Sequence, residues 1–236
     1  VEIVAGVCPW TADVVRSARQ MGYRRVVLNT HGPALASPPV LQSLLRAGVD
    51  AFRLTLLATR SERHDALTGV HGALPSVLAA LTAVAGSAPL EVVVPLLRGN
   101  LPATRRIARR TLALPRSTTL VLLFPRPIER PDGVSLAPLA RLEVAARYAA
   151  LAGLLAVEAG RNVRIEGIPL CLLPPALHVH ATPIDGKAAR PAPCRACELA
   201  DPCSGTWDRY LELVGTGELR PRPGLVTSLV SHSSAG

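Results

Sequence analysis

The chain has 236 residues and a net charge of +9, and 49% of its residues are hydrophobic while 18% are charged. This composition excludes a disordered chain, and the length suits one large domain with its own core. Of the 26 basic residues 25 are arginines, scattered along the chain rather than interleaved with aromatic side chains. We therefore expect no nucleic-acid partner, and the densest group, at 105–110, indicates a solvated helix face.

The longest apolar run, at 148–157, is too short for a membrane-spanning helix, which needs about 20 residues. The chain does not open with the charged and then apolar segments of a secretory signal. We therefore expect a cytoplasmic protein without a membrane partner.

Short apolar runs alternate with helical patterns along residues 1–168. The expected strands are 1–6, 25–30, 52–57, 91–97, 119–124 and 162–168. The helices expected between them are 11–21, 38–47, 72–84, 101–114 and 136–159. Strands that are apolar throughout are typical of a parallel sheet buried on both faces. Five βα units and a sixth strand predict an α/β fold, a partial parallel (β/α) barrel, with a doubly wound open sheet as the alternative.

In either architecture, ligands bind at the carboxyl ends of the strands. The residues that end the first five runs are therefore expected near one rim of the sheet. They are Gly6, Thr30, Leu57, Leu97 and Phe124. An antiparallel pair among these five strands would contradict the prediction.

From Pro169 onward, prolines break the chain into irregular segments, and only 206–214 resembles a helix. The Ser-rich end, 225–236, is expected to be a loose tail. We therefore divide the chain into a barrel part at 1–168, an extension containing cysteines at 169–224, and the tail.

The strongest local motif is Cys194-Arg-Ala-Cys197, followed by Cys203. Thiolates at this spacing hold zinc or an iron–sulfur cluster. The expected fourth ligand is Cys171, directly after the sixth strand, with His178 and His180 as the competing candidates. An odd number of cysteines without a secretory signal disfavours a disulfide framework, and Cys8 is expected to be an ordinary core thiol.

Several segments, in their order along the chain, resemble the radical S-adenosylmethionine (radical SAM) superfamily. They are Val-Val-Leu-Asn-Thr-His-Gly at 26–32, Phe-Arg-Leu-Thr-Leu-Leu at 52–57 with His-Asp-Ala-Leu-Thr-Gly at 64–69, the strand and Asn at 92–100, and the cysteine segments at 167–171 and 194–205 with 210–221. The last segments resemble the C-terminal extensions called SPASM, or twitch when truncated.

This resemblance implies specific site residues. Cys171, Cys194, Cys197 and Cys203 would hold an auxiliary 4Fe-4S cluster, with zinc as the alternative that the residues leave open. Thr30, Gly32, Thr55 and Asn100 would line the S-adenosylmethionine side of the barrel mouth. The substrate is unknown, with a peptide as one candidate class.

Two departures from the family pattern bear on activity. The Cys-x3-Cys-x2-Cys loop that binds the catalytic cluster is absent, and Ala-Gly-Val-Cys-Pro-Trp-Thr at 5–11 stands where Gly-Gly-Glu-Pro is expected. An intact member would generate a 5′-deoxyadenosyl radical that abstracts hydrogen from its substrate, whereas this chain alone is expected to be inactive. The alternative is a non-catalytic scaffold or binding protein that holds iron–sulfur or zinc.

Three further polar groups follow or lie on the expected strands. His31 and the pair His64-Asp65 are interpreted as turn and capping residues, with ligand contact or acid–base chemistry as alternatives. Glu166 is a candidate buried carboxylate on the sixth strand, otherwise a paired polar residue at the rim.

Overall fold

The computed structural model describes residues 1–130, 133–182 and 188–223. Its main sheet has seven strands in the order β1-β2-β3-β4-β5-β8-β9, and every neighbouring pair is parallel. Their bounds are β1 (Glu2–Val4), β2 (Val27–Thr30), β3 (Ala51–Thr55), β4 (Leu90–Pro95), β5 (Thr119–Leu123), β8 (Asn162–Glu166) and β9 (Ala181–Thr182). The predicted partial parallel barrel is confirmed, and the first five strands end at one rim as expected.

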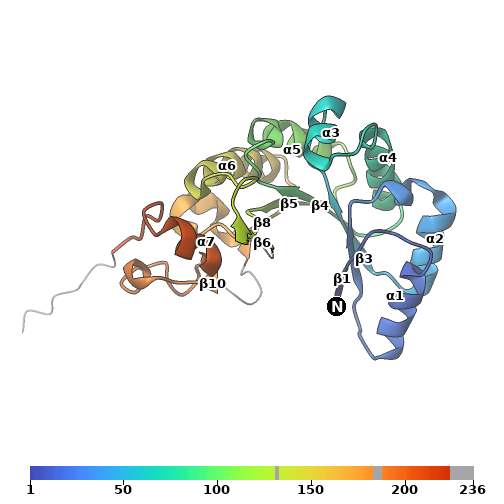
Figure 1. Cartoon of the computed structure of the whole chain (residues 1–236), viewed down its shortest axis with the longest axis horizontal. Helices are drawn as coiled ribbons and strands as arrows, with labels where there is room; N and C mark the ends of the chain where they lie inside the picture. The colour runs from blue at the N-terminus through green and yellow to red at the C-terminus, as the bar shows by residue number, and fades with distance from the viewer. Residues whose placement is uncertain (131–132, 183–187, 224–236) are drawn as a thin grey trace, which may run out of the picture.

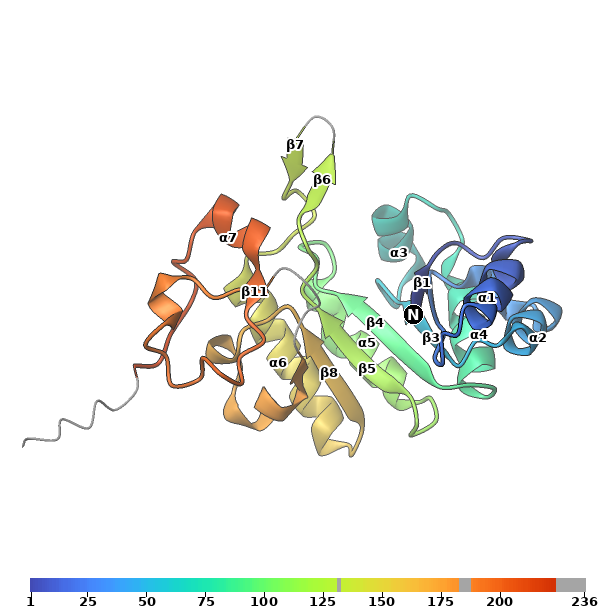
Figure 2. The same cartoon turned by 90° about the horizontal axis from the view of Figure 1, so that it is seen from below.

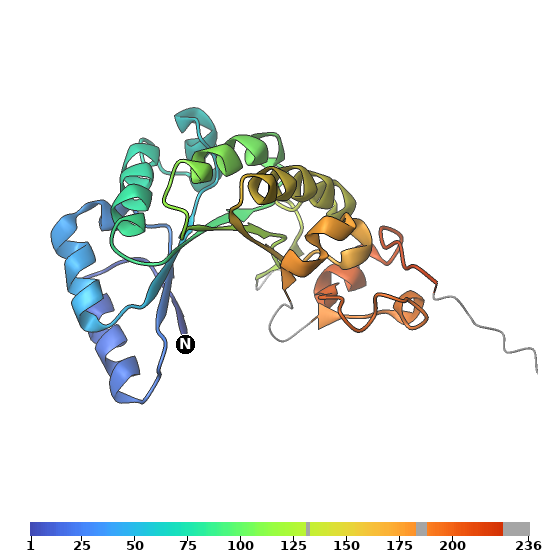
Figure 3. The same cartoon turned by 180° about the vertical axis from the view of Figure 1, so that it is seen from behind.

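The helices follow the convex side of the curved sheet, and the concave side is open (Figures 1 and 3). They are α1 (Thr11–Gln20), α2 (Pro38–Ala47), α3 (Ser61–Thr68), α4 (Leu74–Ala85), α5 (Thr104–Leu112) and α6 (Leu142–Glu158), with 3-10 turns η1 (Pro33–Ala36) and η2 (Leu101–Ala103). Helix α2 illustrates how local sequence sets the ends of a helix: prolines occupy its first two positions, and Gly48 ends it with φ 108°.

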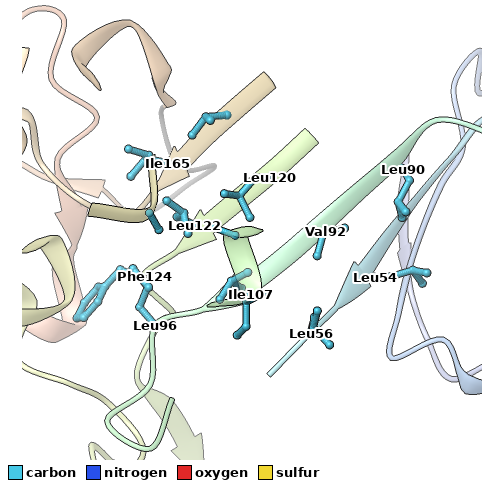
Figure 4. Close-up of a cluster of buried hydrophobic side chains, with 14 of the residues drawn as sticks. Leu54, Leu56, Leu90, Val92, Leu96, Ile107, Leu120, Leu122, Phe124 and Ile165 are labelled. Atoms are coloured by element: carbon cyan, nitrogen blue, oxygen red, sulfur yellow. The ribbon is translucent and has the colours of Figure 1, made fainter. Parts of the chain in front are cut away.

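The core lies between these helices and the convex face of the sheet. Figure 4 shows Leu54, Val92, Leu120 and Ile165, from four strands, in one cluster with Ile107 of α5. These five side chains are at most 1% exposed. Burying each aliphatic side chain contributes about 1.5–3 kcal/mol, so this layer is a main source of stability.

The other face of the sheet differs from the prediction. The expectation that the strands are buried and apolar on both faces is wrong for β1, where Glu2 and Val4 are exposed, and for β3, β4 and β8. Arg53, Glu91, Arg164 and Glu166 alternate with the core residues of these strands and form ion pairs with one another. The concave face therefore carries charge.

Several elements were not expected from the sequence. Helix α3 and the antiparallel hairpin β6 (Ile128–Arg130) with β7 (Gly133–Ser135) are additional, and the hairpin projects away from the sheet (Figure 2). Helix α6 begins at Leu142 rather than at 136, because the preceding segment bonds to the loop after β4, where Arg98 N donates to Pro138 O. The predicted tail lies outside the described residues.

The extension after β8 packs at the end of the sheet opposite β1 (Figures 1 and 2). It contains η3 (Leu170–Leu172), η4 (Pro175–His180), η5 (Ala192–Cys194), an antiparallel pair of β10 (Ala188–Ala189) with β11 (Thr206–Trp207), and α7 (Asp208–Val214). Trp207 Nε1 donates to Phe124 O at 2.7 Å, and Thr206 Oγ1 donates to Gly167 O at 2.9 Å. Gly167 has φ 77°, and a Cβ there would lie 2.6 Å from Phe124 O, so this contact requires glycine.

The extension also caps helix α6. Leu142 N donates to Tyr210 Oη at 3.1 Å, and Glu143 N donates to Glu218 Oε2 at 2.8 Å. Tyr210 Oη in turn donates to Glu218 Oε1 at 2.9 Å. Glu218 is only 3% exposed, so a buried carboxylate accepts from the second amide of α6 and complements the positive end of the helix dipole, while Tyr210 Oη accepts from the first amide.

No helix in the described part of the chain is long and apolar enough to cross a membrane.

Candidate metal centre

The four cysteines predicted as ligands line one small cavity in the extension. Cys171 comes from η3, Cys194 ends η5, and Cys197 and Cys203 lie on the loop between η5 and β11. All four are half-buried, and none forms a disulfide. Most of the remaining lining is apolar, so the cavity offers thiols as its characteristic donors.

Backbone amides point at three of the four sulfurs. Arg220 N donates to Cys171 Sγ, Arg222 N to Cys197 Sγ and Gly205 N to Cys203 Sγ, each at 3.4 Å. Glu198 N also donates to Arg222 O at 2.9 Å, which fixes the 219–223 segment against the cysteine loop. Hydrogen bonds to sulfur stabilise thiolates and are a common second layer around metal-bound cysteines.

Burial raises the pKa of Cys171, and the neighbouring thiols add to this while the Arg220 amide opposes it. Burial also raises the pKa of Cys194, again with a contribution from the other three thiols and an opposing one from Arg190. Gathering four thiolates here therefore requires a cation to compensate their charge. The chemistry of the donor set and the amide contacts fit a thiolate-bound cluster.

The competing ligands lie elsewhere. His178 Nε2 lies 3.2 Å from Leu173 O, and neither His178 nor His180 lines the cysteine cavity. Cys8 is on a different cavity, near α1 and α2, with its Sγ 3.2 Å from Thr11 Oγ1. Within the described ranges, no group of three or more His, Cys, Asp or Glu side chains is arranged to hold a single metal ion. Ligand binding by the cysteines stays a prediction.

The residues proposed for the barrel mouth are at the carboxyl ends of the strands, but several have local structural roles. Asn100 is fully buried; its Nδ2 donates to Pro95 O at 2.8 Å and its Oδ1 accepts from Leu97 N at 2.9 Å. Gly32 has φ 81°, and a Cβ there would lie 2.9 Å from Leu54 Cδ2. Thr30 Oγ1 accepts from Gly32 N at 3.4 Å, whereas Thr55 lines a cavity. Cofactor contact by these four residues stays a prediction.

The concave face carries a charge network that the sequence interpretation largely missed. Arg53 Nη2 donates to Glu166 Oε2 at 3.0 Å, and Arg164 Nε donates to Glu166 Oε1 at 2.7 Å. Glu91 pairs with both arginines, and Glu2 lies 3.7 Å from Arg53 Nε. Burial lowers the pKa of Arg164, but Glu91 and Glu166 outweigh it and raise that pKa overall. Glu166 is therefore a paired carboxylate, and the alternation of charged and apolar residues at 163–166 was the available signal.

No protein-family model matches the chain, and no curated protein matches it. Among the solved structures that do match is a domain of the pyruvate-formate lyase-activating enzyme from Bacteroides vulgatus. The likeness covers 68% of this chain and 97% of that chain, with 17% sequence identity and a TM-score of 0.49. The fold assignment itself rests on the strand order and the parallel pairing.

Proposed function

We propose that this chain is an iron–sulfur protein of the radical SAM type, in which Cys171, Cys194, Cys197 and Cys203 hold an auxiliary 4Fe-4S cluster. The observation that carries the proposal is the shared cavity of the four thiols, with backbone amides directed at three of the sulfurs. Four thiolates serve zinc and iron–sulfur clusters alike. The choice of a cluster follows the ordered motifs that resemble the radical SAM family.

In this proposal the chain contributes ligands and surroundings. The four thiolates anchor the cluster, the amides of Gly205, Arg220 and Arg222 stabilise their charge, and the apolar lining restricts water. When bound, such a cluster supplies electron transfer or a site for substrate. The open concave face is the proposed place for S-adenosylmethionine, with Thr30, Gly32, Thr55 and Asn100 at its rim. The proposed location is cytoplasmic, and the substrate is unknown.

Anaerobic reconstitution followed by iron and sulfide analysis tests the cluster. We expect about four iron and four sulfide per chain, a loss of most of both in Cys194→Ser and Cys203→Ser, and no loss in the matched control Cys8→Ser. Zinc at about one per chain without labile sulfide would overturn the cluster and favour the non-catalytic scaffold.

The radical chemistry is tested separately. Because 1–236 contains no Cys-x3-Cys-x2-Cys loop, we expect no 5′-deoxyadenosine from the reduced, reconstituted chain supplied with S-adenosylmethionine. Detecting that product from this chain would show that our view of its missing catalytic cluster is mistaken.

A further inference from the structure

A further cavity lies at the carboxyl ends of β2 and β3 and is also lined by α3 and the start of α4. Its volume is about 290 Å³, near the lower limit for small-molecule sites. Leu57, Leu67 and Val77 are among the apolar residues that make up most of its lining. The polar lining comes from two histidines and two threonines, and none of the lining residues is Asp, Glu, Lys or Arg.

His64 is unusual among the lining residues, because its side chain is only 4% exposed and yet lacks a hydrogen-bond partner for a buried nitrogen. Its Nδ1 is buried without a hydrogen-bond partner, and so is Oδ1 of Asp65, 3.9 Å away. Buried polar atoms without partners are rare in folded proteins and call for an explanation. Asp65 is itself held in place, since its Oδ2 accepts from Gly72 N at 3.0 Å.

The protonation of His64 follows from its surroundings. Burial lowers the pKa of His64, with Asp65 opposing this change and His31 adding to it. His71 is exposed and contacts the outer oxygen of Asp65. The ring is therefore neutral at pH 7, with one donor and one acceptor nitrogen. The Asp65 carboxylate beside Nδ1 favours the proton there, which leaves Nε2 as the acceptor.

Nε2 of His64 makes no hydrogen bond to any described residue, and it is not among the buried atoms without partners. His64, which lines the cavity, thus has one buried nitrogen, Nδ1, and one nitrogen, Nε2, that is available to accept a hydrogen bond from a ligand. The lack of charged side chains in the lining disfavours an anionic or cationic ligand, because no opposite charge in the lining would compensate the charge of the ligand.

We propose that this cavity binds a small uncharged molecule with an apolar body and one hydroxyl or N–H donor, which donates its hydrogen bond to His64 Nε2. This inference goes beyond the proposed function and does not depend on the cysteine cluster, although Thr55, which is proposed for the rim of the S-adenosylmethionine site, also lines this cavity. The two sites are tested by different residues and readouts.

Phenol and toluene are suitable probes, because they share size and shape but only phenol donates a hydrogen bond. Ligand-observed NMR titrations at pH 7 give the affinity of each. We expect phenol to bind about fivefold to tenfold more tightly than toluene, the effect of one net hydrogen bond. His64→Phe should reduce phenol to the level of toluene, whereas the exposed control His71→Ala should keep the difference.

The nitrogen chemical shifts of the His64 ring in the wild-type chain provide a second measurement that does not depend on a variant. Phenol should move the Nε2 signal more than the Nδ1 signal. Equal affinities for phenol and toluene, no saturable binding of either probe, or an unchanged Nε2 signal would each overturn the proposal.

Discussion

Glu218 allows the attachment of the extension to the barrel to be tested quantitatively. Its buried carboxylate accepts hydrogen bonds from Glu143 N and Tyr210 Oη, and Arg141 Nε lies 3.4 Å from Oε1. Glu218→Gln keeps the size of the side chain but removes its charge and turns one acceptor into a donor. One buried donor then loses its partner, which costs about 1–3 kcal/mol. The helix dipole also loses its compensating charge, which costs about 0.5–2 kcal/mol.

We therefore expect Glu218→Gln to lower the free energy of unfolding by about 1.5–5 kcal/mol. Urea denaturation followed by far-ultraviolet circular dichroism measures this value. The matched control is Glu212→Gln, an exposed carboxylate on α7 that pairs with Arg209, for which a change below about 0.5 kcal/mol is expected. A Glu218→Gln variant as stable as this control would refute the assignment of Glu218 as a buried cap of α6.

Four further results are expected. Burial raises the pKa of Tyr210 to about 12, so in an absorbance titration of the three tyrosines it should ionise last, and Tyr210→Phe should remove that late step. Because the unfolded chain releases this proton first, stability should fall as the pH rises from about 10 toward 12. The pKa of His64 is lowered by burial, so the unfolded chain binds its proton first, and stability should fall as the pH decreases below about 6.5, less steeply in His64→Phe. Gly167→Ala should lower the free energy of unfolding by about 2 kcal/mol or more in urea titrations, because alanine is strained at this φ and its Cβ meets Phe124 O. Cys171 and Cys194 should react with iodoacetamide more slowly than a free thiol in the metal-free chain, as mass spectrometry of the labelled peptides would reveal.

The sequence predicts the sheet well because each strand is a short apolar run followed by a helical pattern. Helix α3 was missed because Ser-Glu-Arg-His-Asp-Ala-Leu-Thr at 61–68 has no continuous apolar face. The charge on the concave face was missed because charged residues within an apolar run, such as Arg53, were considered one at a time. Every second residue of a strand points to the same face, so such residues on neighbouring strands come together.

The cysteine site was predictable only in part. The spacing of Cys194, Cys197 and Cys203 indicates a thiolate site, since those ligands are close in sequence. The amides of Arg220 and Arg222 come from a segment with no motif of its own, so their role depends on the tertiary fold. The cap of α6 is equally non-local, because Glu143 and Glu218 are 75 positions apart.

The cap of α6 also bears on the order in which the protein folds during synthesis. The sheet grows by adding each strand next to the one made before it, from β1 to β5 and then β8. Helix α6 is translated well before Tyr210 and Glu218, so its first amides have no protein partner until the extension emerges from the ribosome. At about 5–20 residues per second, that interval lasts several seconds. We expect the barrel to form first with a frayed α6, and the docking of the extension to complete both the helix and the cysteine cavity in one late step.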